Sequence, residues 1–254
     1  MPRARSIGVR LLLCTLLAAA HRSSRAARAV PGGFQAAAVQ PAALPAMPQW
    51  AQELDKPGES RRESLAWNKK TVADANDEGR QLDFVLWGDS LTAALQFKYP
   101  ETWNEWFGEY DAAPLGVSAS TVEELAWRIM GGRERLNVGP KVIAILIGTN
   151  NEMDSQPAAK LGVLLTWLER AYPASKLLVI PPPPSWQRRY IPLRDAYGAM
   201  LRSHPRVFFS LCGAGLDPAS FDDMKDGVHP VPGGYDIMLR CLKSQVAARL
   251  SGRV

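Results

Sequence analysis

The sequence contains few of the residues on which metal sites, redox centres and nucleotide sites depend. It has only three cysteines and three histidines among 254 residues, and neither a His-Glu-x-x-His nor a Cys-x-x-Cys pattern occurs. A glycine-rich phosphate loop is also absent. These absences give no reason to expect a metal or a nucleotide, so we expect no cofactor.

Long hydrophobic runs are absent too. The most apolar stretch, residues 11–20, is too short for a stable membrane span. It follows arginines and precedes small residues that end near Ala29, as in a secretory signal. We therefore expect residues 1–29 to be a targeting segment that leads to a secreted or extracytoplasmic protein. An organelle lumen is the alternative, because an arginine-rich, acid-free segment also suits a transit peptide.

Acidic residues are missing from the first 52 positions, which hold six arginines and no lysine. Removing these six from the 30 basic residues leaves 24 basic against 25 acidic side chains, so the remainder has a net charge of −1. A basic surface for nucleic acid is therefore not indicated, and we expect no nucleic-acid partner. The Ala- and Pro-rich composition of residues 30–52 predicts a flexible linker outside the fold. Residues 53–254 are predicted to form one domain.

Strand-like and helix-like segments alternate along this domain. The strand-like runs are residues 82–87, 112–117, 142–147, 177–181 and 207–212, and the helix-like segments are residues 120–130, 158–171, 192–202 and 233–250. This alternation is typical of an α/β fold in which a parallel sheet carries helices on both faces.

Four short motifs occur in a fixed order along the domain. They are Gly88-Asp89-Ser90, Gly116-Val117-Ser118-Ala119, Gly148-Thr149-Asn150-Asn151 and Asp226-Gly227-Val228-His229. Ser90 follows a strand-like run and precedes a helix-like one, at the end of a parallel strand where ligands bind in open α/β sheets. The motifs supply a hydroxyl, an imidazole, a carboxylate and amide donors, which are the groups that ester hydrolysis requires.

With these motifs, and with Ala126-Trp127-Arg128-Ile129 and Gly233-Gly234-Tyr235, the sequence resembles the SGNH hydrolases, also called GDSL esterases and lipases. The likeness runs from about Trp67 to Leu250 and is strongest to members like the platelet-activating-factor acetylhydrolase catalytic subunit. It implies a three-layer α/β/α sandwich with a five-stranded parallel sheet of the flavodoxin-like type. It also implies Ser90 as nucleophile, His229 as base, Asp226 as its partner and Asn150 as an oxyanion donor.

The residues themselves favour the same roles. His21 lies in the expected targeting segment and His204 near the end of a helix-like segment, which leaves His229 as the candidate base. Asp226 precedes it by three residues, so one loop delivers both groups. Asp222 and Asp223 are the alternative acids. Thr92 stands where a Gly-x-Ser-x-Gly elbow has its second glycine, which argues against an α/β-hydrolase.

The oxyanion hole is expected to use the backbone N–H groups of Ser90 and Ala119 beside the Asn150 amide. Ala119 departs from the family pattern, which has glycine there. We expect a negative φ at Ala119, because alanine then offers its N–H as freely as glycine does. The alternative is a position that requires a positive φ, at which alanine is strained and glycine would raise both stability and activity.

Two further predictions concern specificity and redox state. Trp186, Arg188, Arg189 and Tyr190 follow a strand-like run and are predicted to line the substrate pocket. Cys212 and Cys241 pair if the protein is exported, but a buried thiol on an apolar strand is the reading we favour for Cys212.

The expected activity is a serine esterase acting on small acyl esters, acetyl or short-chain, of a lipid or carbohydrate. Its expected partner is a small-molecule ester, and a homodimer is left open. An acyltransferase on the same scaffold and a non-catalytic ligand-binding module are the alternatives.

Overall fold

The computed structural model describes residues 43–55, 58–186 and 190–252. Its centre is a five-stranded sheet in the order β2-β1-β3-β4-β5, in which every neighbouring pair is parallel. The strands are β1 (Phe84–Gly88), β2 (Ala112–Gly116), β3 (Val142–Leu146), β4 (Lys176–Ile180) and β5 (Val207–Phe209). The predicted parallel sheet is therefore confirmed.

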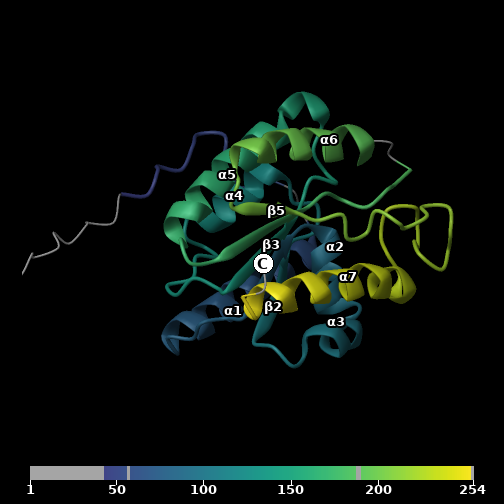
Figure 1. Ribbon diagram of the computed structural model, residues 1–254, viewed down its shortest axis with the longest axis horizontal. Helices are drawn as coiled ribbons and strands as arrows, with labels where there is room; N and C mark the ends of the chain where they lie inside the picture. The colour runs from purple at the N-terminus through teal and green to yellow at the C-terminus, as the bar shows by residue number, and fades with distance from the viewer. Residues whose placement is uncertain (1–42, 56–57, 187–189, 253–254) are drawn as a thin grey trace, which may run out of the picture. The chain divides into compact units, whose positions relative to one another are not determined.

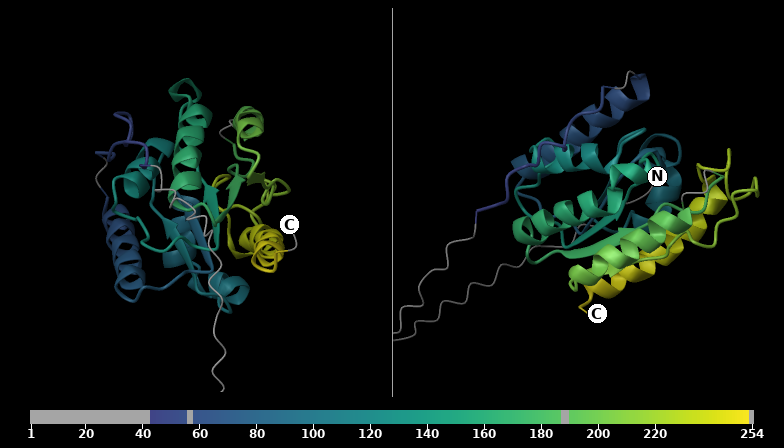
Figure 2. Two further views of the ribbon diagram at one scale, coloured as in Figure 1. Left: turned by 60° about the vertical axis from the view of Figure 1, so that its left-hand side comes forward. Right: turned by 90° about the horizontal axis from the view of Figure 1, so that it is seen from above.

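Helices cover both faces of the sheet, because successive side chains of each strand point to opposite sides. In β1, Val85 and Trp87 join one hydrophobic core, whereas Phe84 and Leu86 join the other. The first core lies under α1 (Glu59–Asp77), α4 (Val122–Met130), α5 (Pro157–Ala171) and α6 (Tyr190–Met200). The second lies under α2 (Ser90–Phe97), α3 (Pro100–Phe107) and α7 (Pro232–Leu250). Figures 1 and 2 show this three-layer arrangement.

Helix α1 was not apparent from the sequence, although it is 19 residues long. Its buried residues have helical spacing, but most of them are polar: Arg61, Ser64, Asn68, Val72 and Ala75. A search for apolar periodicity does not detect such a helix. Short 3₁₀ turns at η1 (Met153–Ser155) and η2 (Leu201–Ser203) complete the described elements. Among the helices of the described residues, none is long and apolar enough to cross a membrane.

The fold begins earlier than the predicted boundary at residue 53. Ala51 is buried, and Leu44 and Trp50 pack against the core under α1, α4 and α5. The Lys160 ammonium lies 5.8 Å from the centre of the Trp50 ring. The last part of the predicted linker is therefore packed, since its apolar side chains cover the core edge. The predicted targeting segment, residues 1–29, and residues 30–42 lie outside the described residues.

Cys212 and Cys241 form a disulfide, so the buried thiol that we favoured for Cys212 is wrong. The predicted fifth strand ends early, at Phe209, and Cys212 lies in the loop beyond it, facing Cys241 of α7 with a Cα–Cα distance of 5.5 Å. The bridge joins residues 29 positions apart, and the enclosed segment contains both Asp226 and His229. The closed segment is thereby restricted in its unfolded states.

Candidate active site

Ser90 lies at the first position of α2, directly beyond the carboxyl end of β1. The close approach of α2 to the sheet depends on Gly116, because a Cβ there would collide with the backbone of Thr92 and Ala93. Asp89 is the N-cap of α2 and accepts a hydrogen bond from the Leu91 N–H at 3.0 Å. The hydroxyl of Ser90 is therefore presented at the rim of the sheet by a fixed turn.

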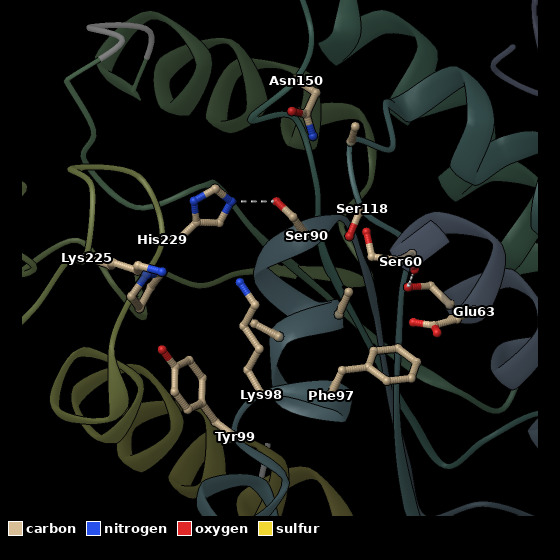
Figure 3. Close-up of a pocket in the computed structure, with 15 residues that line it drawn as sticks. Ser60, Glu63, Ser90, Phe97, Lys98, Tyr99, Ser118, Asn150, Lys225 and His229 are labelled. Carbon is tan, nitrogen blue, oxygen red and sulfur yellow. Dashed lines mark hydrogen bonds between the residues drawn. The ribbon is translucent and has the colours of Figure 1, made fainter. Parts of the chain in front are cut away.

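The structure brings Ser90, His229 and Asp226 together in one line of contacts. The Ser90 Oγ lies 3.1 Å from His229 Nε2, and His229 Nδ1 lies 2.9 Å from Asp226 Oδ2 (Figure 3). The alternative acid Asp223 instead accepts a hydrogen bond from the Asp217 N–H. His204 contacts Glu169. A hydroxyl, imidazole and carboxylate in this order form the arrangement in which a neutral serine loses its proton.

Asp226 is held as a carboxylate by the turn that it begins. Burial by itself would raise its pKa, but hydrogen bonds from the backbone and ring of His229 and from the Val228 N–H bring that pKa below its usual value. The Lys225 N–H also donates to the His229 carbonyl at 2.8 Å, which closes the turn. The turn therefore fixes the position of the Asp226 carboxylate relative to the His229 imidazole.

The predicted amide donors lie at the same rim. Asn150 Nδ2 donates to the Ser120 carbonyl at 3.0 Å, which fixes the amide plane, and Asn150 lines the same cavity as Ser90 and Ala119. The Ser90 N–H belongs to the first turn of α2, whose N–H groups have no partner within the helix. Asn151 instead accepts a hydrogen bond from the Val122 N–H and so joins this loop to the start of α4.

The backbone of Ala119 is left-handed, with φ of 59°. Our expectation of a negative φ is therefore wrong. The motif turns back sharply between Val117 and Ser120, whose N–H donates to the Val117 carbonyl at 3.1 Å, and this turn carries Ala119 into a region that favours glycine. The chain thus carries backbone strain at the position where the resemblance implies glycine.

We expect Ala119→Gly to raise the free energy of unfolding by ~0.5–1 kcal/mol. Release from the left-handed region outweighs the added freedom that glycine gives the unfolded chain. Thermal melting measures the gain, and Ala113→Gly in β2 is the control, since that residue has no positive φ and should lose stability. An Ala119→Gly midpoint below that of the wild type would contradict the assigned strain.

Asp89 is a fully buried carboxyl beside Ser90. Burial raises its pKa from 3.8 to about 6, and the hydrogen bond from the Leu91 N–H offsets only part of this effect. The folded protein therefore holds this proton over a pH range in which the unfolded chain has released it. Stability due to Asp89 is present below pH 3.8 and is lost as the pH rises to about 6.

We expect Asp89→Asn to gain stability relative to the wild type as the pH rises from 4 to 6. A shift of about two pKa units corresponds to about 3 kcal/mol, and asparagine keeps the capping oxygen without the charge. Urea unfolding at several pH values measures the difference. Asp217→Asn, which removes an exposed carboxylate that accepts from the Ala219 N–H, is the control. A pH-independent difference for Asp89→Asn would contradict the raised pKa.

A network of buried polar side chains, which we did not predict from the sequence, holds the backbone on which the site is built. Arg128 is fully buried in α4. It donates to the carbonyls of Gly88 and Leu115 and to Ser120 Oγ, and it pairs with Glu134. It therefore joins the end of β1 to both sides of the Ala119 turn. The available signal was a pair of charged residues, Glu124 and Arg128, at helical spacing on a mostly apolar face.

The same network extends to α1. Asn68 donates to the Gly116 carbonyl and to Glu134. Arg61 donates to the Ser118 carbonyl at 3.2 Å and forms an ion pair with the buried Glu124. These contacts explain why the inner face of α1 is polar: it bonds the backbone of the Gly116–Ala119 motif.

A cavity of about 470 Å³ contains Ser90 and His229. Its remaining walls come from α1 (Ser60, Glu63, Ser64), from α2 and the residues after it (Ala93, Ala94, Phe97, Lys98, Tyr99), from Ser118, Ala119 and Asn150, and from Lys225 and Pro230. The α1 and α2 walls were not anticipated. Among the described residues, no group of three or more His, Cys, Asp or Glu side chains is arranged to hold a metal.

The predicted pocket residues after β4 lie elsewhere. Trp186 is 58% exposed, and its ring lies over Gly227, where any Cβ would collide with it. The backbone N–H of Trp186 donates to the Gly227 carbonyl at 3.1 Å. Tyr190 begins α6 and stacks with Arg194. Neither is among the residues that line the cavity around Ser90, so a role for Trp186 and Tyr190 in substrate binding stays a prediction. Arg188 and Arg189 lie outside the described residues.

Residues 86–237 match the model of the GDSL-like lipase/acylhydrolase family. The chain belongs to this family. Among the relatives of this GDSL hydrolase is subunit alpha1 of bovine platelet-activating factor acetylhydrolase IB, 27% identical over 203 residues, or 75% of this chain and 84% of the relative. The human alpha2 subunit is 29% identical over 137 residues, or 53% and 56% of the two chains. The GDSL hydrolase is accordingly an ester hydrolase.

Solved structures show the same fold. A family 3 carbohydrate esterase from Clostridium thermocellum has a TM-score of 0.53 and 17% identity, and the match covers 68% of this chain and 98% of that one. An aryl esterase from M. smegmatis has a TM-score of 0.51 and 20% identity, with coverage of 65% and 98%. The three-layer architecture of the GDSL hydrolase, predicted from its resemblance, is thus confirmed.

Proposed function

We propose that the protein is a serine esterase that hydrolyses small acyl esters of a lipid or carbohydrate through an acyl-enzyme on Ser90. The observation that carries the proposal is the contact series from Ser90 Oγ to His229 Nε2, at 3.1 Å, and from His229 Nδ1 to Asp226, at 2.9 Å, with Ser90 and His229 lining one cavity. A serine hydroxyl is nucleophilic only when a base accepts its proton during attack.

In the first half-reaction the Ser90 oxygen attacks the ester carbonyl while His229 Nε2 takes the hydroxyl proton. Asp226 accepts the Nδ1–H, which fixes the tautomer and stabilises the imidazolium. The imidazolium then protonates the alkoxide that leaves, and the acyl group remains on Ser90. Water repeats the sequence against the acyl-enzyme, with His229 again as base, and releases the acid.

The negative charge that develops on the carbonyl oxygen is taken up by donors that are already in place. Ser90, Ala119 and Asn150 all line the cavity, and we assign this role to the backbone N–H groups of the first two and to the Asn150 amide. The contact of Asn150 Nδ2 with the Ser120 carbonyl holds the amide still, so little reorganisation accompanies the reaction. The left-handed φ of Ala119 belongs to the turn that brings its N–H to this rim.

Two features support a short acyl group. The relatives named above are acetylhydrolases, and the wall beside Ser90 on α2 is formed by the small side chains of Ala93 and Ala94. We therefore place an acetyl or short-chain group beside this wall. The larger remainder of the cavity then holds the alcohol portion.

The test is a series of p-nitrophenyl esters of increasing acyl length, followed by rapid mixing and by mass spectrometry of acid-quenched enzyme. We expect a burst of p-nitrophenol, acyl label on the peptide that contains Ser90, and the highest kcat/KM for the shortest acyl groups. Release at the uncatalysed rate would contradict an enzyme and favour a binding module. Faster release with added alcohols, together with new esters, would favour acyl transfer over hydrolysis.

We also propose that the mature protein acts in an oxidising, extracytoplasmic compartment. The Cys212–Cys241 disulfide supports this location, because disulfides persist outside the reducing cytosol. The arginine-rich, acid-free start of the sequence is consistent with export. Fractionation of cells that express the full chain, with mass determination of its N-terminus, tests it. Intact protein in the cytosol, with free thiols, would contradict the proposal.

A further inference from the structure

The cavity has a basic wall that the proposed chemistry does not use. Lys98 follows α2 directly, and Lys225 directly precedes Asp226. Both line the cavity together with Ser90 and His229, and Tyr99 lies beside them. In Figure 3 the two ammonium groups point into the same space below Ser90 and His229, and the Tyr99 hydroxyl points the same way.

Neither lysine has an ion-pair partner among the residues that the structure describes. Lys70, Lys141, Lys160 and Lys243 pair with carboxylates, whereas Lys69 and Lys176, like Lys98 and Lys225, have no ion-pair partner among the described residues but lie outside the cavity. The helix C-terminus offers a structural reason for Lys98 alone, because a cation there interacts favourably with the helix dipole. It offers none for Lys225, which lies in the loop that carries Asp226 and His229.

Both lysines are attached to parts of the molecule that position the reacting groups. The Lys98 N–H donates to the Ala94 carbonyl at 2.9 Å, at the far end of the helix that begins with Ser90. The Lys225 N–H donates to the His229 carbonyl at 2.8 Å. Tyr99 is fixed by its ring contact with the buried Tyr235, with centroids 5.5 Å apart. A group held between these side chains therefore has a defined position relative to the Ser90 hydroxyl.

The opposite wall carries a negative charge, so the charge of the cavity lining differs between its two ends. Glu63 lies on α1, across the cavity from Lys225 and next to the Phe97 ring (Figure 3). Negative charge is repelled at that end and attracted at the lysine end. We propose that Lys98 and Lys225, with the Tyr99 hydroxyl, form a binding site for an anionic group on the alcohol portion of the ester. The substrate class is thus an acyl ester that also bears a carboxylate or a phosphate.

This inference rests on the proposed function, and its test separates the two. The probes are 4-acetoxybenzoate, its neutral methyl ester and 4-acetoxyphenyl phosphate, which carry the same acetyl group on a phenolic oxygen. The measured quantity is the ratio of kcat/KM for each anionic ester to that for the neutral one. Comparing this ratio between enzymes cancels the intrinsic reactivities, and comparing the two anions distinguishes carboxylate from phosphate.

We expect Lys98→Met with Lys225→Met to lower the ratio about tenfold, the scale of two ion pairs near the surface. Lys98→Arg keeps the charge and should keep most of the ratio. Lys69→Met, which removes an exposed lysine of α1 outside the cavity, should leave it unchanged. In the wild type the ratio should also fall as salt is raised, because exposed charges are screened.

An unchanged ratio in the double variant, with both esters still hydrolysed through Ser90, would overturn the anion site and leave the esterase intact. If the wild type hydrolyses none of the three esters in a Ser90-dependent way, the proposed function fails, and the anion site fails with it. Thermal melting of each variant shows that a changed ratio does not come from partial unfolding.

Discussion

Ser90→Ala is expected to lower turnover of p-nitrophenyl acetate by at least about 10³-fold and to abolish acyl labelling. Without the hydroxyl, water must attack the ester directly, and the His229–Asp226 pair has no nucleophile to activate. The residual rate would come from the oxyanion donors and from substrate binding. Such a loss exceeds what the removal of any single donor of the site would produce.

The fold should tolerate this substitution. Ser90 is partly exposed at the cavity, and the capping hydrogen bond of α2 comes from Asp89, not from Ser90. We therefore expect the free energy of unfolding to change by less than about 0.5 kcal/mol. Ser203→Ala, which removes an exposed hydroxyl that bonds the Met200 carbonyl, is the matched control and should keep full activity. Retention of more than a tenth of the wild-type rate in Ser90→Ala would remove it as nucleophile.

The parallel sheet and the contact series from Ser90 to Asp226 could be predicted from the sequence, and there is a physical reason for this. Buried parallel strands are nearly continuous apolar runs, and residues just beyond their ends converge at one rim. Ser90 and Asn150 follow β1 and β3, which are neighbours in the sheet. Asp226 and His229 lie three residues apart, so one turn brings them together.

Features that depend on packing between distant segments could not be predicted from the sequence. Helix α1 buries a polar face, since that face bonds backbone carbonyls of the Gly116–Ala119 motif, and apolar patterns do not report such a role. The Cys212–Cys241 pair depends on how α7 packs beside the end of the sheet. The φ of Ala119 follows from the turn around it, and a single alanine in a sequence gives no sign of it.

The buried Arg128 could be predicted only in part. It belongs to a helix that the sequence predicted, but it bonds segments that are far apart in the sequence. Its guanidinium donates to the Gly88 carbonyl at 3.0 Å, to the Leu115 carbonyl at 2.9 Å and to Ser120 Oγ at 3.2 Å. Its charge is balanced by Glu134, which is also buried. The ends of β1 and β2 are thus held at a fixed distance beneath the site.

Arg128→Met is expected to cost about 3–5 kcal/mol of the free energy of unfolding. Methionine fills part of the volume, but among the described side chains the Glu134 carboxylate then keeps Asn68 alone as a donor. The carbonyls of Gly88 and Leu115 each lose the hydrogen bond from Arg128, although Gly88 still accepts from the Val117 N–H. Urea unfolding measures the loss. Arg133→Met is the control, because Arg133 is an exposed arginine that lies over the Trp127 ring, and its loss should cost under about 1 kcal/mol.

A double-mutant cycle separates the buried charge from the lost hydrogen bonds. Adding Glu134→Gln to Arg128→Met removes the unpaired carboxylate, so the double variant should recover at least about 1 kcal/mol relative to Arg128→Met. The Arg128 hydrogen bonds to Gly88 and Leu115 remain absent, so we expect the turnover of the double variant to be below that of the wild type even where it is fully folded. A double variant as active as the wild type would show that Arg128 stabilises the fold without positioning Ser90 and the Ala119 turn.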